Sequence, residues 1–231
     1  MDNKLIYEFS SHKTDGDASL SNLLGGKGAN LAEMSKLGIQ VPPGFTITTE
    51  ACNYFSMNKK LPDGLKEEII SYVSNLEGLS QKSFGNSESP LLLSVRSGGM
   101  ISMPGMMDSI LNIGLNDDNV QSLAKAFNDQ RFALDSYRRL IQMYSNVVLG
   151  VEVGRFEAVI ANKKRMDNVT SDADFNVDQL EWIINAYKNT VERFTNSPFP
   201  QDPHEQLLGA CLLYTSPSPR DISGSRMPSS A

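Results

Sequence analysis

The sequence of 231 residues has little cysteine, histidine or tryptophan, with two, two and one of these residues respectively. Cys52 and Cys211 cannot form a disulfide framework, and this favours a reducing, cytoplasmic setting. Cys52 is expected to be a small buried apolar residue. Of the histidines, His204 stands beside Pro203 and Glu205 and is expected at the surface. Chemistry that depends on several histidines or cysteines is therefore not indicated.

Long apolar runs and an excess of positive charge are also missing. No run approaches the ~20 residues that a membrane span needs, and the first residues, MDNKLIYEFS, show no apolar core of a secretory signal. The net charge is −6, with a pI of about 5.0. Binding to nucleic acid or to a membrane is thereby disfavoured, because a nucleic-acid binder needs a basic surface. With 40% hydrophobic and 21% charged residues, the composition is that of a globular protein.

The most informative stretch runs from Pro90 to Asp117. Leu91–Leu93 and the residues up to Arg96 predict a buried strand that ends at this arginine. Gly98, Gly99 and Gly105 follow, and a glycine-rich loop lets backbone N–H groups approach an anion closely. An arginine beside such a loop suits phosphate, because its guanidinium is planar and always charged. The alternative is an ordinary strand-to-loop junction with a solvated arginine, and the residues alone leave both open.

A second glycine-rich segment, Leu24–Asn30, surrounds Lys27. The apolar residues Leu31, Met34 and Leu37, with Gly38 behind them, predict an amphipathic helix that starts after this segment. Lys27 would then lie at a helix N-terminus, where free N–H groups and the helix dipole favour anions. The pattern is not a Walker A loop, because positions 21 and 28 hold the wrong residues. A glycine turn with an exposed lysine is the alternative.

The rest of the chain predicts mainly helices. Lys4–Phe9 and Phe45–Ile47 are expected as short strands, with Thr48 or Thr49 capping the next helix. Further helices are indicated by the apolar spacing of Leu65–Leu76, of residues 131–149, of Phe156–Ile160 and of Leu180–Phe194. Gln81–Ser89 is expected as a surface loop. Asp135, Arg138 and Arg139 lie on the helix at 131–149, and an arginine in this context usually extends from the core edge into solvent.

Several long strings resemble the pyruvate, phosphate dikinase family in its amino-terminal, nucleotide-binding part. They are SVRSG with SMPGMMDSILNIGLND, GGKGANLAEMSKLGIQVPPGFTITTEAC, RFALDSYRRLIQMYSNVV and FPQDPHEQLLGA, in the family's order over about residues 1–210. The resemblance implies an α+β fold, an incomplete ATP-grasp-like domain with a mostly helical insertion. It also implies that ATP and its phosphates are bound by Lys27, Arg96, Gly98, Gly105, Asp108, Ser109 and Arg139. For Asp108 and Ser109, capping of the following turn is the alternative.

The resemblance further implies the reaction. In the family, ATP phosphorylates a histidine on a central domain, inorganic phosphate accepts a phosphoryl group to form pyrophosphate, and the phosphohistidine converts pyruvate to phosphoenolpyruvate. Mg²⁺ accompanies ATP, and its oxygen ligands are expected outside this chain, so no metal-ligating residue is assigned here. The implied partners are ATP, inorganic phosphate, and the phosphohistidine and pyruvate-binding domains of a full-length homodimer. No catalytic residue is expected in this chain, which alone should be inactive.

The implied organisation is an ATP-grasp-like subdomain at 1–115, a helical subdomain at 116–198 and a return to the first at 199–210. Residues 211–231 are rich in serine and proline, so they are expected to be disordered and foreign to the family. Two other functions stay open: the nucleotide-binding part of phosphoenolpyruvate synthase, which uses water in place of phosphate, and a non-catalytic nucleotide-binding fragment. All nucleotide-binding interpretations share one expectation, that Lys27 and Arg96 converge on one anion-binding pocket.

Overall fold

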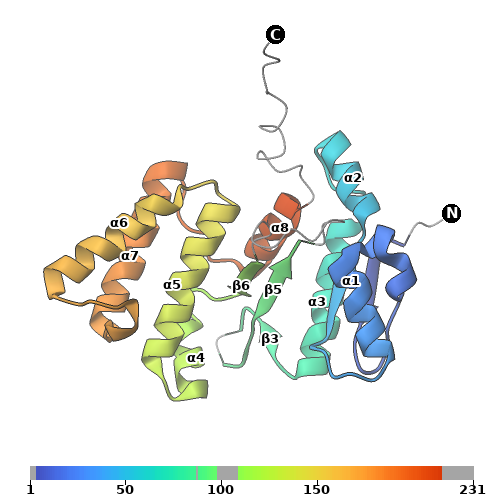
Figure 1. Ribbon diagram of the computed structural model, residues 1–231, viewed down its shortest axis with the longest axis horizontal. Coiled ribbons are helices and arrows are strands. Elements are labelled where there is room, and N and C mark those ends of the chain that lie inside the picture. The colour runs from blue at the N-terminus through green and yellow to red at the C-terminus, as the bar shows by residue number, and fades with distance from the viewer. Residues whose placement is uncertain (1–3, 87, 98–108, 215–231) are drawn as a thin grey trace, which may run out of the picture. The chain divides into compact units, whose positions relative to one another are not determined.

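The computed structural model describes residues 4–86, 88–97 and 109–214, which form two compact units. Among these residues, the first unit takes in 4–72, 97 and 211–214, and the second takes in 73–86, 88–96 and 109–210. Figure 1 labels the helices α1 to α8 and the strands β3, β5 and β6. No helix in these ranges combines the length and the apolar character that crossing a membrane requires.

In the first unit, an antiparallel pair of strands provides the framework. β1 (Ile6–Phe9) pairs with β2 (Gly44–Ile47), so that Ile6 lies opposite Ile47 and Phe9 opposite Gly44. Successive side chains of a strand point to opposite faces. Accordingly, Thr46 contacts Gly28 of one helix, whereas the ring of Phe45 lies 5.5 Å from that of Tyr72 on another. Both predicted strands are confirmed.

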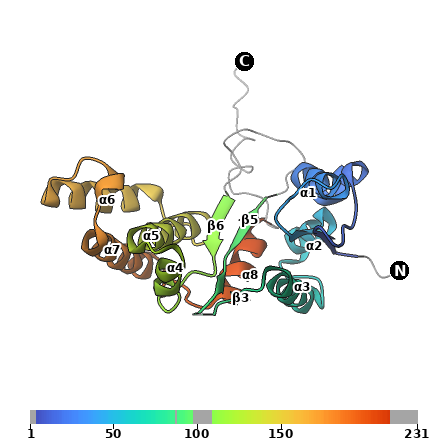
Figure 2. The same ribbon diagram turned by 90° about the horizontal axis from the view of Figure 1, so that it is seen from below.

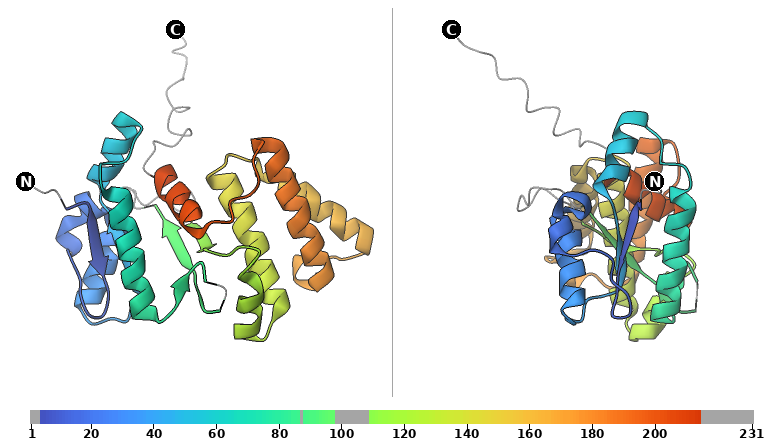
Figure 3. Two further views of the ribbon diagram at one scale, coloured as in Figure 1. Left: turned by 180° about the vertical axis from the view of Figure 1, so that it is seen from behind. Right: turned by 90° about the vertical axis from the view of Figure 1, so that its right-hand side faces the viewer.

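Three helices accompany this pair: α1 (Ser21–Lys36), α2 (Thr49–Asn58) and α3 (Leu65–Ser80), with a 3₁₀ turn, η1 (Ala18–Leu20), before α1. The part of α3 from residue 73 onward is assigned to the second unit. Figure 3 shows β1 between α1 and α3. Thr48 caps α2, because its hydroxyl accepts the Ala51 N–H at 3.4 Å. All four apolar positions predicted for α3 are buried, namely Leu65, Ile69, Val73 and Leu76.

The buried face predicted for α1 is wrong. Met34 and Leu37 are 38% and 68% exposed, whereas Leu24, Ala29 and Ala32 are nearly completely buried. The helix turns its small residues toward the strands, because Gly28 sits directly against Thr46 and larger side chains would not fit there. Close packing of backbone therefore decides which face is buried, in preference to the burial of the largest side chains.

In the second unit, the strands are short and lie in two pairs. β3 (Ser83–Phe84) runs parallel to β4 (Pro90–Leu91), and β5 (Leu93–Arg96) runs antiparallel to β6 (Ser109–Ile113). The predicted single buried strand is thus divided at Leu92, and β5 alternates between half-buried and exposed residues. The predicted loop at 81–89 contains β3, because Phe84 is buried and anchors that segment.

The helices of this unit include those predicted from apolar spacing at 131–149, Phe156–Ile160 and Leu180–Phe194, although Phe194 itself is 43% exposed. They are α4 (Val120–Phe127), α5 (Gln130–Val147), α6 (Val153–Asp167) and α7 (Val177–Thr195), with a 3₁₀ turn, η2 (Asp172–Asp174), before α7. In Figure 2, α4, α5, α6 and α7 form one group. The ring of Phe156 packs edge-on against that of Tyr187 at 4.8 Å, which joins α6 to α7. Buried apolar side chains of α5 and α7 fill the core of this group.

The last described helix, α8 (Pro203–Tyr214), lies beside β5 and β6 in Figures 1 and 2. Gln206, completely buried, accepts the Gly114 N–H at 2.9 Å and donates to the carbonyls of Leu115 and Pro200 at 3.0 and 2.9 Å. The helix continues to Tyr214, so residues 211–214 are not disordered as predicted. The remainder of the predicted tail lies outside the described residues.

Helices and small sheets together make an α+β chain, in agreement with the predicted class. The two compact units do not coincide with the predicted subdomains, because residues 73–96 pack with the helical residues beyond 109. The subdomain boundaries at 115 and 198 stay a prediction for the domain as it occurs in the family.

Candidate nucleotide-binding site

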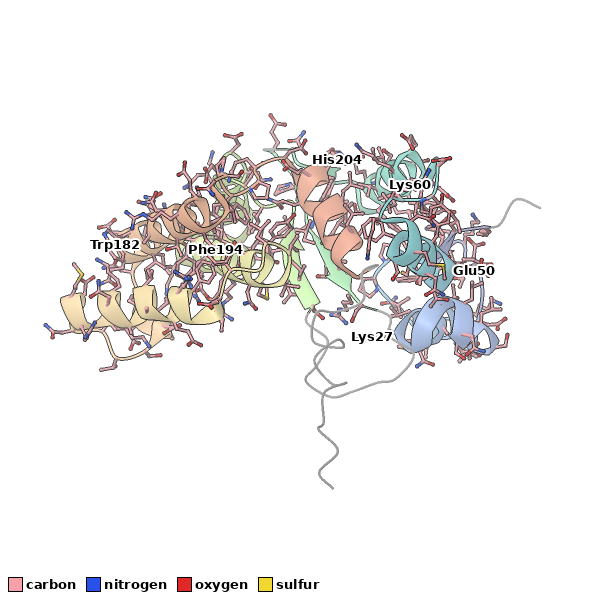
Figure 4. All side chains as sticks on the ribbon, turned by 90° about the horizontal axis from the view of Figure 1, so that it is seen from above. Lys27, Glu50, Lys60, Trp182, Phe194 and His204 are labelled. Atoms are coloured by element: carbon pink, nitrogen blue, oxygen red, sulfur yellow. The ribbon has the colours of Figure 1, made fainter. Side chains whose placement is uncertain are left out.

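A backbone break precedes Lys27. Gly25 has φ 68° and ψ 163°, a conformation that is essentially open only to glycine, and it interrupts α1. The helical segment that follows begins with Gly26, Lys27 and Gly28, whose N–H groups are at a helix start. Lys27 therefore has the predicted setting, except that Ser21–Leu24 before the break are already helical. The Lys27 side chain is exposed and is labelled in Figure 4.

Gly28 fixes this turn against the strands. A Cβ atom at this position would lie 2.7 Å from Cγ2 and 2.8 Å from Oγ1 of Thr46. At Gly26, by contrast, a Cβ would meet nothing within 4 Å. The glycine at 28 is therefore needed for packing, while the glycine at 26 leaves the backbone beside Lys27 open. An anion that approached the N–H groups at the helix start would find room there.

Arg96 is the last residue of β5, as predicted. It lies opposite Ser109 in the β5–β6 pair, and its side chain is exposed. No ion pair involves Arg96 within the described ranges. Ser109 is the first residue of β6. Gly98, Gly105 and Asp108 lie outside the described residues, so their predicted contacts with phosphate stay predictions.

Arg139 lies on α5 next to a buried arginine. Asp135 accepts the Arg139 Nε–H at 2.8 Å through one carboxylate oxygen and the Arg138 Nε–H at 2.8 Å through the other. The Arg138 side chain is only 5% exposed, while that of Arg139 is 63% exposed. Of the two arginines, Arg139 is the one that can meet a ligand, which agrees with its predicted role without testing it.

Lys27 belongs to the first unit and Arg96 and Arg139 to the second. The structure thus establishes the local setting of each residue, and their convergence on one pocket stays a prediction. The part played by Asp135 was not predicted from the sequence. Its spacing of three and four residues from two arginines was the available signal, because such pairs meet on one helix face.

The structure describes no cluster of three or more His, Cys, Asp or Glu side chains that could hold a metal ion. Asp117 accepts the Tyr137 hydroxyl at 3.0 Å and pairs with Lys188. His204 is half-buried rather than on the open surface, and its ring packs edge-on against Phe84 at 5.2 Å.

The family described as pyruvate phosphate dikinase, AMP/ATP-binding domain, matches residues 21–84, which include the break at Gly25 and Lys27. Pyruvate, phosphate dikinase of Clostridium symbiosum is 47% identical over 209 residues, and that of Rhizobium meliloti is 46% identical over 208. The enzyme of Entamoeba histolytica is 45% identical over 204 residues.

Over about nine-tenths of its length, this chain matches pyruvate, phosphate dikinases. The resemblance seen in the motifs is thereby confirmed. The matched region takes in 90% of this chain, but only 23% of the Rhizobium dikinase and 24% of the Clostridium dikinase. It thus corresponds to about a quarter of the relatives' length.

Proposed function

We propose that this chain is the ATP-binding part of a pyruvate, phosphate dikinase, a phosphotransferase that interconverts ATP, phosphate and pyruvate with AMP, pyrophosphate and phosphoenolpyruvate. One observation carries the proposal: the AMP/ATP-binding family match covers residues 21–84, and within it lies the Gly25 break that puts Lys27 at a helix start. Free N–H groups and a lysine ammonium at such a place favour a phosphate group.

Transfer of a phosphoryl group depends mainly on positioning and on neutralising charge. In the proposed site, Lys27, Arg96 and Arg139 supply positive charge to the phosphates, and Gly98, Gly105, Asp108 and Ser109 contact them. The domain is proposed to be ATP-grasp-like. Mg²⁺ would enter with ATP, and hard oxygen ligands elsewhere would hold it, because the described residues do not form a site for it.

The remaining partners belong to the same proposal. They are inorganic phosphate and the phosphohistidine and pyruvate-binding domains of a homodimeric enzyme in the cytoplasm. Relatives that match along nine-tenths of the chain are named as phosphate-using dikinases, which favours phosphate over the water used by phosphoenolpyruvate synthase. Neither histidine has the setting of a phosphate carrier: His12 lies in a turn, where its backbone N–H bonds Ser10, and the His204 ring is stacked edge-on against Phe84.

Isothermal titration of the purified chain with ATP tests the proposal. We expect saturable binding, and Lys27→Ala or Arg96→Ala should weaken it about 10-fold or more, since a hydrogen bond to a charged group contributes about 1.5–3 kcal/mol. Lys66→Ala is the matched control, because Lys66 is an exposed lysine on α3, outside the proposed site. Unchanged affinity in both site variants, or equal losses in the control, would exclude this assignment.

A further inference from the structure

A charged triad on α5 has a feature that the proposed function does not explain. Asp135 contacts both arginines that follow it, through different oxygens. Its Oδ1 accepts the Arg138 Nε–H at 2.8 Å and lies 2.7 Å from Arg138 Nη2, while its Oδ2 accepts the Arg139 Nε–H at 2.8 Å. One carboxylate therefore holds two guanidinium groups that differ greatly in exposure.

The two arginines differ in burial, and this gives them different roles. Arg138 is buried with Asp135, whose side chain is 14% exposed, and it also donates to Gln142 at 3.3 Å. Burial by itself would lower the pKa of Arg138, but the adjacent Asp135 carboxylate raises it above its ordinary value. Arg138 thus serves as the permanent counter-ion of Asp135, and the buried pair carries no net charge.

Because Arg138 already neutralises Asp135, the positive charge of Arg139 is not cancelled, and the hydrogen bond to Asp135 orients its guanidinium group. Asp135 accepts a hydrogen bond from the Arg139 Nε–H, and among the described residues the two terminal nitrogens have no hydrogen bond or ion pair with a residue other than Asp135. A guanidinium held at Nε still presents the edge formed by those two nitrogens, which matches two oxygens of a phosphate. A lysine in its place would have a single ammonium, which could not serve the aspartate and a phosphate with the same geometry.

We propose that Asp135 is a positioning residue, which orients Arg139 toward the phosphates of ATP while Arg138 neutralises the aspartate. The inference rests on the proposed function, in which Arg139 contacts ATP. The alternative is that Asp135 and Arg139 form an ordinary exposed ion pair that contributes little to stability. In that interpretation Asp135 competes with the ligand for Arg139, and its removal would strengthen binding.

The test is ATP titration of the purified chain with four variants. Arg139→Ala should weaken binding about 10-fold to 100-fold, since one charge-assisted contact is lost. Arg139→Lys should lose nearly as much, although it keeps the charge. Asp135→Asn should also weaken binding, although it removes a negative charge near the ligand. In the Asp135→Asn/Arg139→Ala double variant the two losses should not add, because both remove the same contact.

Each result separates positioning from its alternatives. If Arg139→Lys retains the affinity of the wild type, or Asp135→Asn tightens binding, positioning is excluded and the proposed function stands. If Arg139→Ala leaves the affinity unchanged, Arg139 does not contact ATP, and its place in both proposals is lost. Arg139 is exposed, so the lysine variant is decisive even if Asp135→Asn unfolds the chain. Emission from Trp182, the one tryptophan of the sequence, reports whether each variant is folded.

Discussion

At the scale of single residues, two neighbouring glycines have opposite structural roles. Gly28→Ala would bring a Cβ atom within 2.7 Å of Thr46, whereas Gly26→Ala would meet nothing within 4 Å. We expect Gly28→Ala to lower the free energy of unfolding by about 1–3 kcal/mol, as overpacking does. Gly26→Ala should leave it unchanged or raise it by up to about 1 kcal/mol, because alanine favours the helix. Urea unfolding followed by circular dichroism measures both.

A rescue experiment distinguishes overpacking from a change in helix propensity. Thr46→Ala removes the atoms that a Cβ at position 28 would meet most closely, Cγ2 and Oγ1. In the Gly28→Ala/Thr46→Ala double variant, most of the stability lost through Gly28→Ala should therefore return. Additive losses would show that the contact with Thr46 is not the reason for the glycine.

At the scale of elements, one amide side chain connects α8 to the end of β6. Gln206 is fully buried and bonds three backbone groups, from Gly114, Leu115 and Pro200. Gln206→Met keeps the volume but leaves these groups without their partner. Each unsatisfied buried group costs about 1–3 kcal/mol, so we expect a total loss of stability of about 2–4 kcal/mol. The loss is measured by urea unfolding monitored through Trp182, which lies in the same unit.

The neighbouring exposed residue provides the control for this element. Glu205→Met changes a solvent-facing position of α8 and should alter the free energy of unfolding by less than about 0.5 kcal/mol. A similar effect of Gln206→Met and Glu205→Met would contradict the assigned role of the amide. Asn119 also bonds the backbone after β6, because its side-chain amide donates to the Gly114 carbonyl at 2.7 Å.

At the scale of the whole molecule, buried tyrosines determine how the helical unit responds to alkali. Burial raises the pKa of Tyr187 to about 12, from an ordinary value near 10, and it raises that of Tyr137 as well. Because the folded state favours the neutral phenol, their contribution to stability is complete below pH 10. It is lost as the pH rises toward the folded-state pKa.

We therefore expect the unfolding free energy to fall between about pH 10 and 12, with a smaller fall in Tyr187→Phe. At neutral pH the same substitution should cost about 1 kcal/mol, because the Tyr187 hydroxyl no longer donates to Gln142. Urea unfolding monitored through Trp182 at several pH values measures both effects. Tyr54→Phe, at an exposed position of α2, is the control. Equal alkaline losses in wild type and Tyr187→Phe would contradict the prediction.

Local sequence signals determined much of the secondary structure. A capping threonine located α2, apolar spacing located α3, α5 and α7, and the strand signal ended at Arg96 where β5 ends. These features depend on residues near in sequence, whose periodicity fixes the element that buries them. The motif strings likewise identified the family before any fold was known, because several long strings occur in the family's order.

Tertiary packing decided what those signals could not. The close approach of Gly28 to Thr46 turned the small residues of α1 inward and left Met34 and Leu37 exposed. Burial separated Arg138 from Arg139, although the two are adjacent and chemically identical. The full set of partners of Gln206 includes residues 91 and 92 positions away. Periodicity within one element contains no information on such neighbours, since it does not say which surface of another element will cover each side chain.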